Sequence, residues 1–376
     1  MRMKPIILLL AGWMAFSCVY PYEVNLQSPA EQILVVDGNI VLGRDASLSV
    51  LSMKSMRDTP GGSYSRANIE DWWVEDDAGT QYKPTSAYGK ASMKTAPEGR
   101  GYRMVMKIEG KTYSTPFQQP LPAPEIKSLE LWADNEQVHV GISLEDKPEA
   151  FGYSAISLEE IWEFHAQFKP EYDYNCIGVY ELEPDDPAIH YWCWAKTSSP
   201  SELLLDYSQY GGGVDQFAIH AFPREDNRNH KNYTIKASVR SISRDEAVYL
   251  KNLDNKAAQG NNLFSPNPGE VPGNVFCEDD PSEQVLGYVS LKAYSARTAH
   301  IGNQYLLEEE MDDNRWFTNL PYADWYEYYY ERNWRPVRFY MPDDAEGPGK
   351  VMGWVERRCV DCEFAGGLLK KPEFDD

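Results

Sequence analysis

Two cysteines near the end of the chain, Cys359 and Cys362, stand three positions apart. Thiolates at this spacing suit a zinc ion, a thioredoxin-type redox centre or a short disulfide equally well. The pair alone does not choose among these chemistries, so the cellular compartment must decide. The glycines Gly366 and Gly367 follow, and they predict a turn that brings the last segment back onto the body of the protein.

The beginning of the chain indicates export. Two basic residues precede an apolar run from Ile6 to Phe16, which is too short to span a bilayer but fits the core of a signal peptide. The run ends on Ala-Phe-Ser-Cys, which resembles the lipobox of bacterial lipoproteins. We therefore expect a signal peptide over residues 1–17, lipidation at Cys18 and a tether over residues 18–31, with plain secretion as the alternative.

Charge and hydropathy exclude some classes of partner. The formal net charge of −22 argues against nucleic acid and against electrostatic docking on anionic lipid. After the signal peptide, no stretch approaches 18 consecutive apolar residues, so we expect the rest of the chain to lie outside the bilayer. Its length is sufficient for two ordinary domains with cores of their own.

Catalytic and metal-binding motifs are missing from the sequence. It contains no G-x-S-x-G and no H-E-x-x-H motif, no calcium loop, and no pair of histidines at metal-ligand spacing. We therefore expect no cofactor, no metal ion and no enzyme activity. With 58 acidic residues, some carboxylate pair reaches glycosidase separation by chance. A surface hydrolase acting on glycans or peptides thus stays the alternative function.

Aromatic residues make up 13% of the chain and are concentrated between residues 316 and 340. An exposed aromatic surface would bind sugar faces or a protein partner, because a flat ring offers a large apolar area at small entropic cost. Alternatively, the rings line a core or form one helix that is aromatic on every side. The candidate surface residues are Trp316, Trp325, Tyr326, Tyr329 and Trp334.

The pattern along the chain is mainly that of β structure. Residues 32–119 carry short runs of alternating polarity between polar turns, which predict a small β-sandwich of immunoglobulin-like or transthyretin-like type. A proline-rich segment from Pro116 to Pro124 then predicts a linker. Residues 120–376 are expected to form a larger, mainly β domain of sandwich type with two or three inserted helices.

Two capping boxes predict where those helices begin. The first opens at Ser157 and predicts a helix to about Phe168. The second opens at Ser243 and predicts a helix that ends near Gly260.

Several motifs are arranged in an order that resembles a known family. They are LVVDG at 34–38, Cys193-Trp194, SRDEAVYLKNL at 243–253, LFSPNPGEVPGN before Cys277, VLGYVS at 285–290 and the closing RCVDC, GG and KPEF. Together they resemble the Bacteroidetes lipoproteins of domain of unknown function 4249, over essentially the whole mature chain. The resemblance implies an outer-membrane lipoprotein that is an accessory or ligand-binding partner of a TonB-dependent transporter, and it implies no catalytic residue.

Lipidation of Cys18 would leave five cysteines, which are Cys176, Cys193, Cys277, Cys359 and Cys362. Because this number is odd, at least one thiol stays unpaired in a monomer. Cys176 and Cys193 flank a turn-rich stretch, which predicts a disulfide across a hairpin. Cys359 and Cys362 pair with each other, or one of them reaches Cys193 or Cys277. An oxidising compartment favours these disulfides over a four-thiolate zinc site and over redox catalysis.

We therefore expect a non-enzymatic lipoprotein that is anchored in the outer membrane at the cell surface and binds a glycan, a peptide or a transporter barrel. A third possibility is a structural protein of the envelope.

Overall fold

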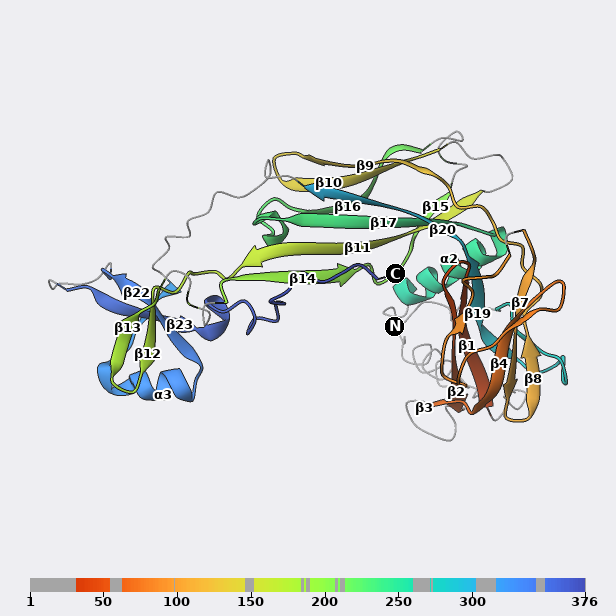
Figure 1. Ribbon diagram of the computed structural model, residues 1–376, viewed down its shortest axis with the longest axis horizontal. Helices are drawn as coiled ribbons and strands as arrows, with labels where there is room; N and C mark the ends of the chain where they lie inside the picture. The colour runs from red at the N-terminus through yellow and green to blue at the C-terminus, as the bar shows by residue number, and fades with distance from the viewer. Residues whose placement is uncertain are drawn as a thin grey trace, which may run out of the picture.

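The computed structural model describes residues 32–54, 63–97, 99–145, 152–183, 186, 190–206, 209, 214–259, 271, 273–301, 316–342 and 349–375. The expected signal peptide, the tether and Cys18 lie outside this part of the chain. The described chain forms three units along its long axis, here called the N-terminal sandwich, the central sandwich and the distal lobe (Figure 1). The predicted mainly β class is confirmed. Within the described residues, no helix is both long and apolar enough to cross a membrane.

The N-terminal sandwich consists of two sheets around one core. In order, the first sheet contains β19 (Val285–Lys292), β1 (Gln32–Val41), β2 (Asp45–Lys54) and β3 (Ser63–Arg66), with β6 (Ala91–Ser92) beside β2. The second contains β18 (Phe276–Cys277), β8 (Lys111–Ser114), β7 (Tyr102–Ile108), β4 (Ile69–Asp76) and β5 (Gln81–Tyr82). Alternating polarity along β7 buries Met104 and Met106, which pack with Val36 and Trp72.

This sandwich extends beyond residues 32–119, because two of its strands come from much later in the chain. Strand β19 pairs in parallel with β1, with Gly287 opposite Val36, and β18 pairs with β8. Gly287 has a φ of 98°, and a Cβ there would lie 1.9 Å from the carbonyl oxygen of Val36. Only glycine fits this close backbone approach.

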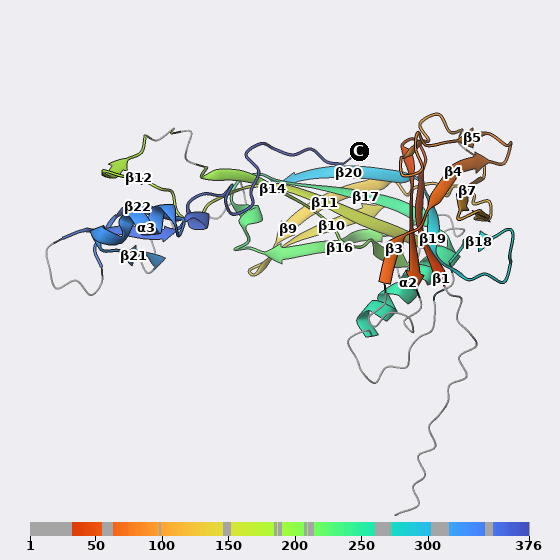
Figure 2. The same cartoon turned by 90° about the horizontal axis from the view of Figure 1, so that it is seen from below.

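The central sandwich also has two sheets, which lie over each other in Figure 2. One contains β16 (Val214–Pro223), β10 (Gln137–Leu144) and β9 (Ile126–Ala133). The other contains β14 (Trp192–Ser198), β11 (Tyr153–His165), β17 (Tyr233–Ile242) and β20 (Tyr294–Ile301), with β15 (Leu203–Asp206) beside β11. Val140, Ile156 and Ile235 from the two sheets share one buried core.

The helix predicted from the capping box at Ser157 is wrong, since this segment lies within strand β11. Strand β11 is paired along both edges, with β14 and β15 on one side and β17 on the other, and this pairing outweighs the local capping signal. The second helix is confirmed as α2 (Arg244–Gln259). Its cap is the predicted one, because the backbone N–H of Glu246 donates to the Ser243 hydroxyl at 3.1 Å.

The distal lobe lies at the far end of the long axis from the N-terminal sandwich (Figure 1). The chain enters it twice, first between β11 and β14 and again after β20. The first passage supplies a hairpin of β12 (Tyr172–Asn175) and β13 (Gly178–Glu181). The second supplies β21 (Thr318–Asn319), η5 (Tyr322–Asp324), α3 (Trp325–Tyr330), β22 (Trp334–Tyr340), β23 (Val351–Glu356) and η6 (Arg357–Cys359). A further short turn, η2 (Asn227–Asn229), connects β16 to β17 in the central sandwich.

A disulfide fastens the C-terminal tail to the central sandwich. Cys193 on β14 is bonded to Cys362, across 169 positions of sequence. The turn predicted at the two glycines is confirmed, because Leu368 and Trp194 exchange backbone hydrogen bonds of 2.7 Å. A Cβ on Gly367 would lie 2.6 Å from the Cβ of Cys193, so the tail needs glycine to pass this close to the strand.

The disulfide predicted between Cys176 and Cys193 is wrong, and so is a short link between Cys359 and Cys362. Cys176 lies exposed in the β12–β13 hairpin, while Cys193 lies on β14, so the hairpin does not bring them together. Of the pairings left open, the bond between Cys362 and Cys193 is the one that forms. Cys277 is buried and Cys359 half-buried, both as free thiols, and burial raises the pKa of Cys359.

Removing the disulfide should destabilise the protein. The double substitution Cys193→Ala and Cys362→Ala frees a loop of 169 residues in the unfolded chain and should lower the free energy of unfolding by about 2 to 5 kcal/mol. Urea denaturation at pH 7 measures this change. The matched control is Cys176→Ala at an exposed free thiol, which should change stability by less than about 0.5 kcal/mol. A peptide found after digestion without reductant in which Cys359 is bonded to Cys362, with no link to Cys193, would contradict the assignment.

Candidate functional site

The short helix α3 divides its aromatic side chains between two faces. Tyr326 and Tyr330 are four residues apart, so they share one face of the helix, and their rings lie 4.9 Å apart. Trp325 and Tyr329 point to the interior of the lobe, where the indole N–H of Trp325 donates to the Leu320 carbonyl at 3.0 Å. No side chain caps the helix, so packing holds it in place.

The packing is centred on Tyr174 of strand β12. Its ring centroid lies 5.3 to 6.2 Å from those of Trp325, Tyr329, Tyr330 and Trp354, in edge-on arrangements. Such contacts add about 0.5 to 1.5 kcal/mol per pair to the burial of the rings themselves. The hairpin, the helix and strand β23 are thereby joined in one core.

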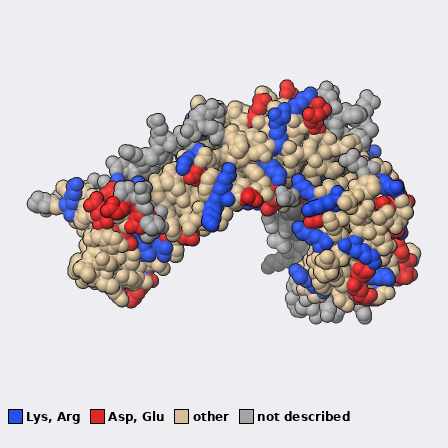
Figure 3. All heavy atoms as spheres, viewed as in Figure 1, with Lys and Arg blue, Asp and Glu red and all other residues tan. Residues whose placement is uncertain are grey.

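The outer faces of the hairpin and of the α3 region together form an exposed surface, which we call the aromatic patch. It comprises four side chains that are 47 to 88% exposed, namely Ile177, Tyr322, Tyr326 and Tyr330. The Tyr322 hydroxyl donates to the Ile177 carbonyl at 3.4 Å, and Cys176 Sγ lies 3.6 Å from the Tyr330 hydroxyl. The part of the lobe where Figure 1 places α3 is covered mainly by uncharged residues in Figure 3.

The structure places the five predicted surface residues in two groups. Trp316 and Tyr326 are exposed, at 60% and 54%. Trp325, Tyr329 and Trp334 are half-buried in the lobe core. The predicted exposed surface therefore describes the first group, and the alternative of a core lining describes the second. Ile177 is not predicted from the sequence, because no local pattern links the hairpin to Tyr322, 145 positions later.

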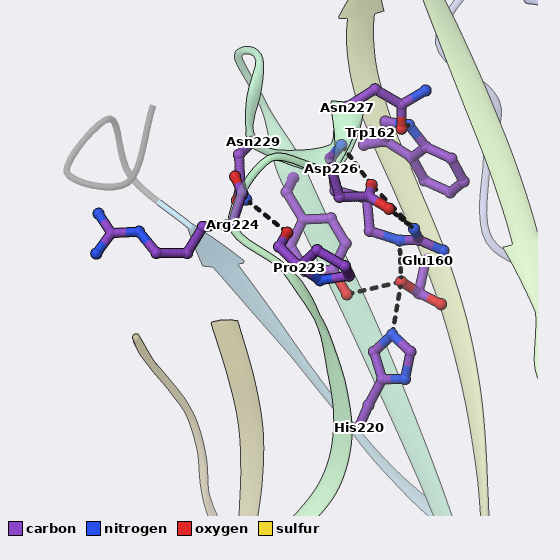
Figure 4. A network of polar contacts seen from close by, with 10 residues as sticks. Glu160, Trp162, His220, Pro223, Arg224, Asp226, Asn227 and Asn229 are labelled. Carbon is purple, nitrogen blue, oxygen red and sulfur yellow. Dashed lines mark hydrogen bonds and ion pairs between the residues drawn. The ribbon is translucent and has the colours of Figure 1, made fainter. Parts of the chain in front are cut away.

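A polar cluster lies in the central sandwich, where side chains of β11, β16 and the η2 turn meet (Figure 4). Glu160 of β11 is buried, and its Oε2 accepts from Arg228 at 2.8 Å and from the Tyr233 hydroxyl at 2.9 Å. His220 Nε2 lies 3.3 Å from the same oxygen. Arg228 also pairs with Asp226 at 2.9 Å.

The charges in this cluster stabilise one another. Burial acts to raise the pKa of Glu160, but the contact with His220, the charge of Arg228 and the bond from Tyr233 together hold it below its ordinary value. Burial acts to lower the pKa of Arg228, but Glu160 and Asp226 raise it. The carboxylate is thus ionised and engaged by protein groups, so we assign the cluster a structural role.

In one group of side chains, the potential ligand atoms lie close enough together to hold a metal ion. His190 Nδ1 lies 2.8 Å from Glu363 Oε2 and 3.5 Å from Asp361 Oδ1. The other oxygen of Asp361 already lies 2.8 Å from the guanidinium of Arg357. Ion pairs account for these contacts, and we assign no metal ion here.

A cavity of about 740 Å³ lies at the junction between the N-terminal sandwich and α2. Phe117 and Tyr288 line it from the sandwich, and Tyr249 lines it from the helix. Glu246 of α2 is bonded there to Ser290 at 2.7 Å and to the buried Arg240 at 2.8 Å. These contacts fasten the helix to both sandwiches, so we describe the cavity as part of the domain junction.

Comparisons with known proteins identify one family. The model of the family described as domain of unknown function DUF4249 matches residues 19–298. No curated protein matches the sequence. A crystal structure described as that of a candidate carbohydrate-binding protein from Bacteroides uniformis is matched at 11% identity, over 56% of this chain and 90% of that chain. Its TM-score of 0.14 is too low to support an argument about fold or function.

Replacing Glu160 tests the structural role of the buried cluster. Glu160→Gln removes the carboxylate from Arg228 and Tyr233 and should lower the free energy of unfolding at pH 7 by about 3 to 5 kcal/mol. The matched control is Glu327→Gln, which breaks an exposed pair with Arg332 and should cost less than about 1 kcal/mol. Equal losses in the two variants would contradict the assignment.

The same variant should show a defined pH dependence. Because the folded-state pKa of Glu160 lies below its ordinary value of 4.5, its stabilisation is present above that value and is lost as the pH falls through the folded pKa. The difference in unfolding free energy between the wild type and Glu160→Gln should therefore be larger at pH 7 than at pH 3. Urea titrations at both pH values measure this difference. A difference that grows on acidification would contradict the predicted direction of the pH dependence.

Proposed function

The chain belongs to the DUF4249 family, and we propose that it is a non-enzymatic lipoprotein of the outer membrane that binds its partner through the distal lobe. In this proposal Cys18 carries the lipid, and the partner is the barrel of a TonB-dependent transporter. The aromatic patch is the observation that carries the proposal. A surface hydrolase is the rival function.

The composition of the patch supports binding to another molecule. Three tyrosines and an isoleucine are exposed side by side, although the same lobe buries several other rings. Adjacent exposed apolar side chains are characteristic of interaction sites. Tyrosine is enriched at the centres of interfaces, because it offers apolar area and a hydroxyl with few rotatable bonds.

The position of the patch also supports this role. Strand β1 begins at Gln32 in the N-terminal sandwich, and the distal lobe lies at the opposite end of the long axis (Figure 1). An anchor at Cys18 precedes β1 by a short stretch of sequence. A lipid there would hold the N-terminal sandwich near the membrane and leave the distal lobe free to reach a neighbouring protein.

The carboxyl groups favour binding over glycoside hydrolysis. A glycosidase needs one carboxyl group with a raised pKa to act as general acid. Among the described residues, every carboxyl group with a resolved shift has a lowered pKa: Asp76, Asp134, Glu160, Glu202, Asp280, Glu283 and Asp375. This direction suits acids that are engaged in ion pairs and hydrogen bonds.

Lipidation is tested by replacing the anchor residue. In cells fed a radioactive or alkyne-labelled fatty acid, the wild type should incorporate the label and fractionate with the outer membrane. Cys18→Ser should lose the label and leave the membrane fraction, because two or three acyl chains make the anchor effectively permanent. Label retained at wild-type levels in Cys18→Ser would contradict an anchor at this residue.

Capture from membranes tests the role of the patch. A tagged wild-type protein from mildly solubilised membranes should recover a TonB-dependent barrel. The triple substitution Tyr322→Ala, Tyr326→Ala and Tyr330→Ala should lower recovery by about tenfold or more, because central aromatic residues each contribute about 2 kcal/mol or more to binding. The matched control replaces Tyr64 and Tyr88, exposed tyrosines of the N-terminal sandwich, and should leave recovery unchanged. Wild-type protein that recovers no barrel would count against the transporter role.

A further inference from the structure

The distal lobe contains a separate cavity of about 170 Å³, which we call the arginine pocket. It lies between the β12–β13 hairpin, the end of α3 and the segment that follows β23. Its polar lining comprises Tyr172, Asp173, Tyr329, Arg335, Arg357 and Asp361. None of these residues belongs to the aromatic patch.

Arg335 is held in a fixed orientation at this pocket. Its Nη1 donates to the carbonyl oxygens of Tyr329 and Trp334, at 3.2 and 2.8 Å. The guanidinium carbon lies 4.0 Å from the centroid of the Tyr329 ring, so the planar group rests on an aromatic face. Its Nε and Nη2 make no hydrogen bond to any described residue, which leaves one edge of the guanidinium available to the pocket.

Two other arginines of limited exposure are paired directly with carboxylates, whereas Arg335 is not. Arg228 and Arg240 each lie between two carboxylates, which are Glu160 and Asp226 for the first and Glu202 and Glu246 for the second. Arg335 forms no ion pair with any carboxylate of the described chain. Burial lowers its pKa and the charge of Arg357 adds to this effect, although Tyr329, Asp173 and Asp361 act in the opposite direction. A partly buried guanidinium without a direct carboxylate partner is costly, and a bound anion would lower that cost.

The acids in the pocket are already engaged. Asp173 accepts hydrogen bonds from the hydroxyls of Tyr329 and Tyr180, at 2.8 and 3.2 Å. Asp361 Oδ2 lies 2.8 Å from both Nε and Nη2 of Arg357. The groups in the pocket that remain available for hydrogen bonding are therefore the N–H donors of the Arg335 guanidinium.

We propose that the arginine pocket binds a small carboxylate, with Nε and Nη2 of Arg335 donating to its two oxygens. This parallel geometry is the one in which a guanidinium recognises a carboxylate best. The volume suits one sugar ring or one amino acid. An acidic sugar and the C-terminus of a peptide present the same group, and the experiment distinguishes them. The pocket goes beyond the proposed function and does not depend on it.

Nuclear magnetic resonance of the purified wild-type protein with labelled arginine tests the proposal directly. D-glucuronate, N-acetylalanine and neutral D-glucose are titrated separately, and the Nε–H signal of Arg335 is followed. We expect saturable shifts with at least one carboxylate, at a Kd of about 1 mM, and none with glucose. The tighter of the two carboxylates identifies the source of the group. No saturable shift with either carboxylate, or an equal shift with glucose, would overturn the proposal.

Variants test whether the two parallel donors of Arg335, Nε and Nη2, form the binding group. Arg335→Lys keeps the charge but removes the parallel donors, so affinity should fall by about tenfold, and Arg335→Gln should weaken binding further. The matched control is Arg332→Gln, at an exposed arginine of the same lobe that is paired with Glu327, and it should bind as the wild type does. Thermal unfolding confirms that each variant is folded. Wild-type affinity in both Arg335 variants would refute the site.

Discussion

The packing of rings around Tyr174 is the interaction on which the distal lobe depends. One buried tyrosine from the hairpin contacts three rings of α3 edge-on, those of Trp325, Tyr329 and Tyr330, together with Trp354 of β23. This packing fixes the rotation of a helix that has no capping side chain. The rotation leaves Tyr326 in the aromatic patch and sets Tyr329 against the arginine pocket, so both candidate binding features follow from one core.

Long-range connections hold distant segments of the chain together. The parallel pairing of β19 with β1 ties the N-terminal sandwich to residues that follow α2. The bond between Cys193 and Cys362 ties the tail to β14. At its far end the tail is held by Lys196, which reaches Asp375 at 2.7 Å. Each link joins segments more than 160 positions apart, so the three units behave as parts of one folded chain.

The sequence predicted those features that depend on local chemistry. Alternating polarity identified β7, the capping box at Ser243 identified α2, and the paired glycines identified the turn before the tail. The sequence-based predictions failed where pairing with distant segments determines the conformation. The box at Ser157 lies in a strand because partners on both edges outweigh its capping signal. Likewise, the partner of Cys362 and the place of Ile177 in the patch are set by tertiary contacts that no local pattern encodes.

Footprinting with hydroxyl radicals tests the central claim, that the aromatic patch is the surface that contacts a partner. Oxidation of each tyrosine is compared between the purified protein and the protein in intact membranes. The account predicts protection of Tyr322, Tyr326 and Tyr330 in the membrane, with Tyr64 and Tyr88 on the N-terminal sandwich equally reactive in both samples. Equal oxidation of the three patch tyrosines in the two samples would contradict it.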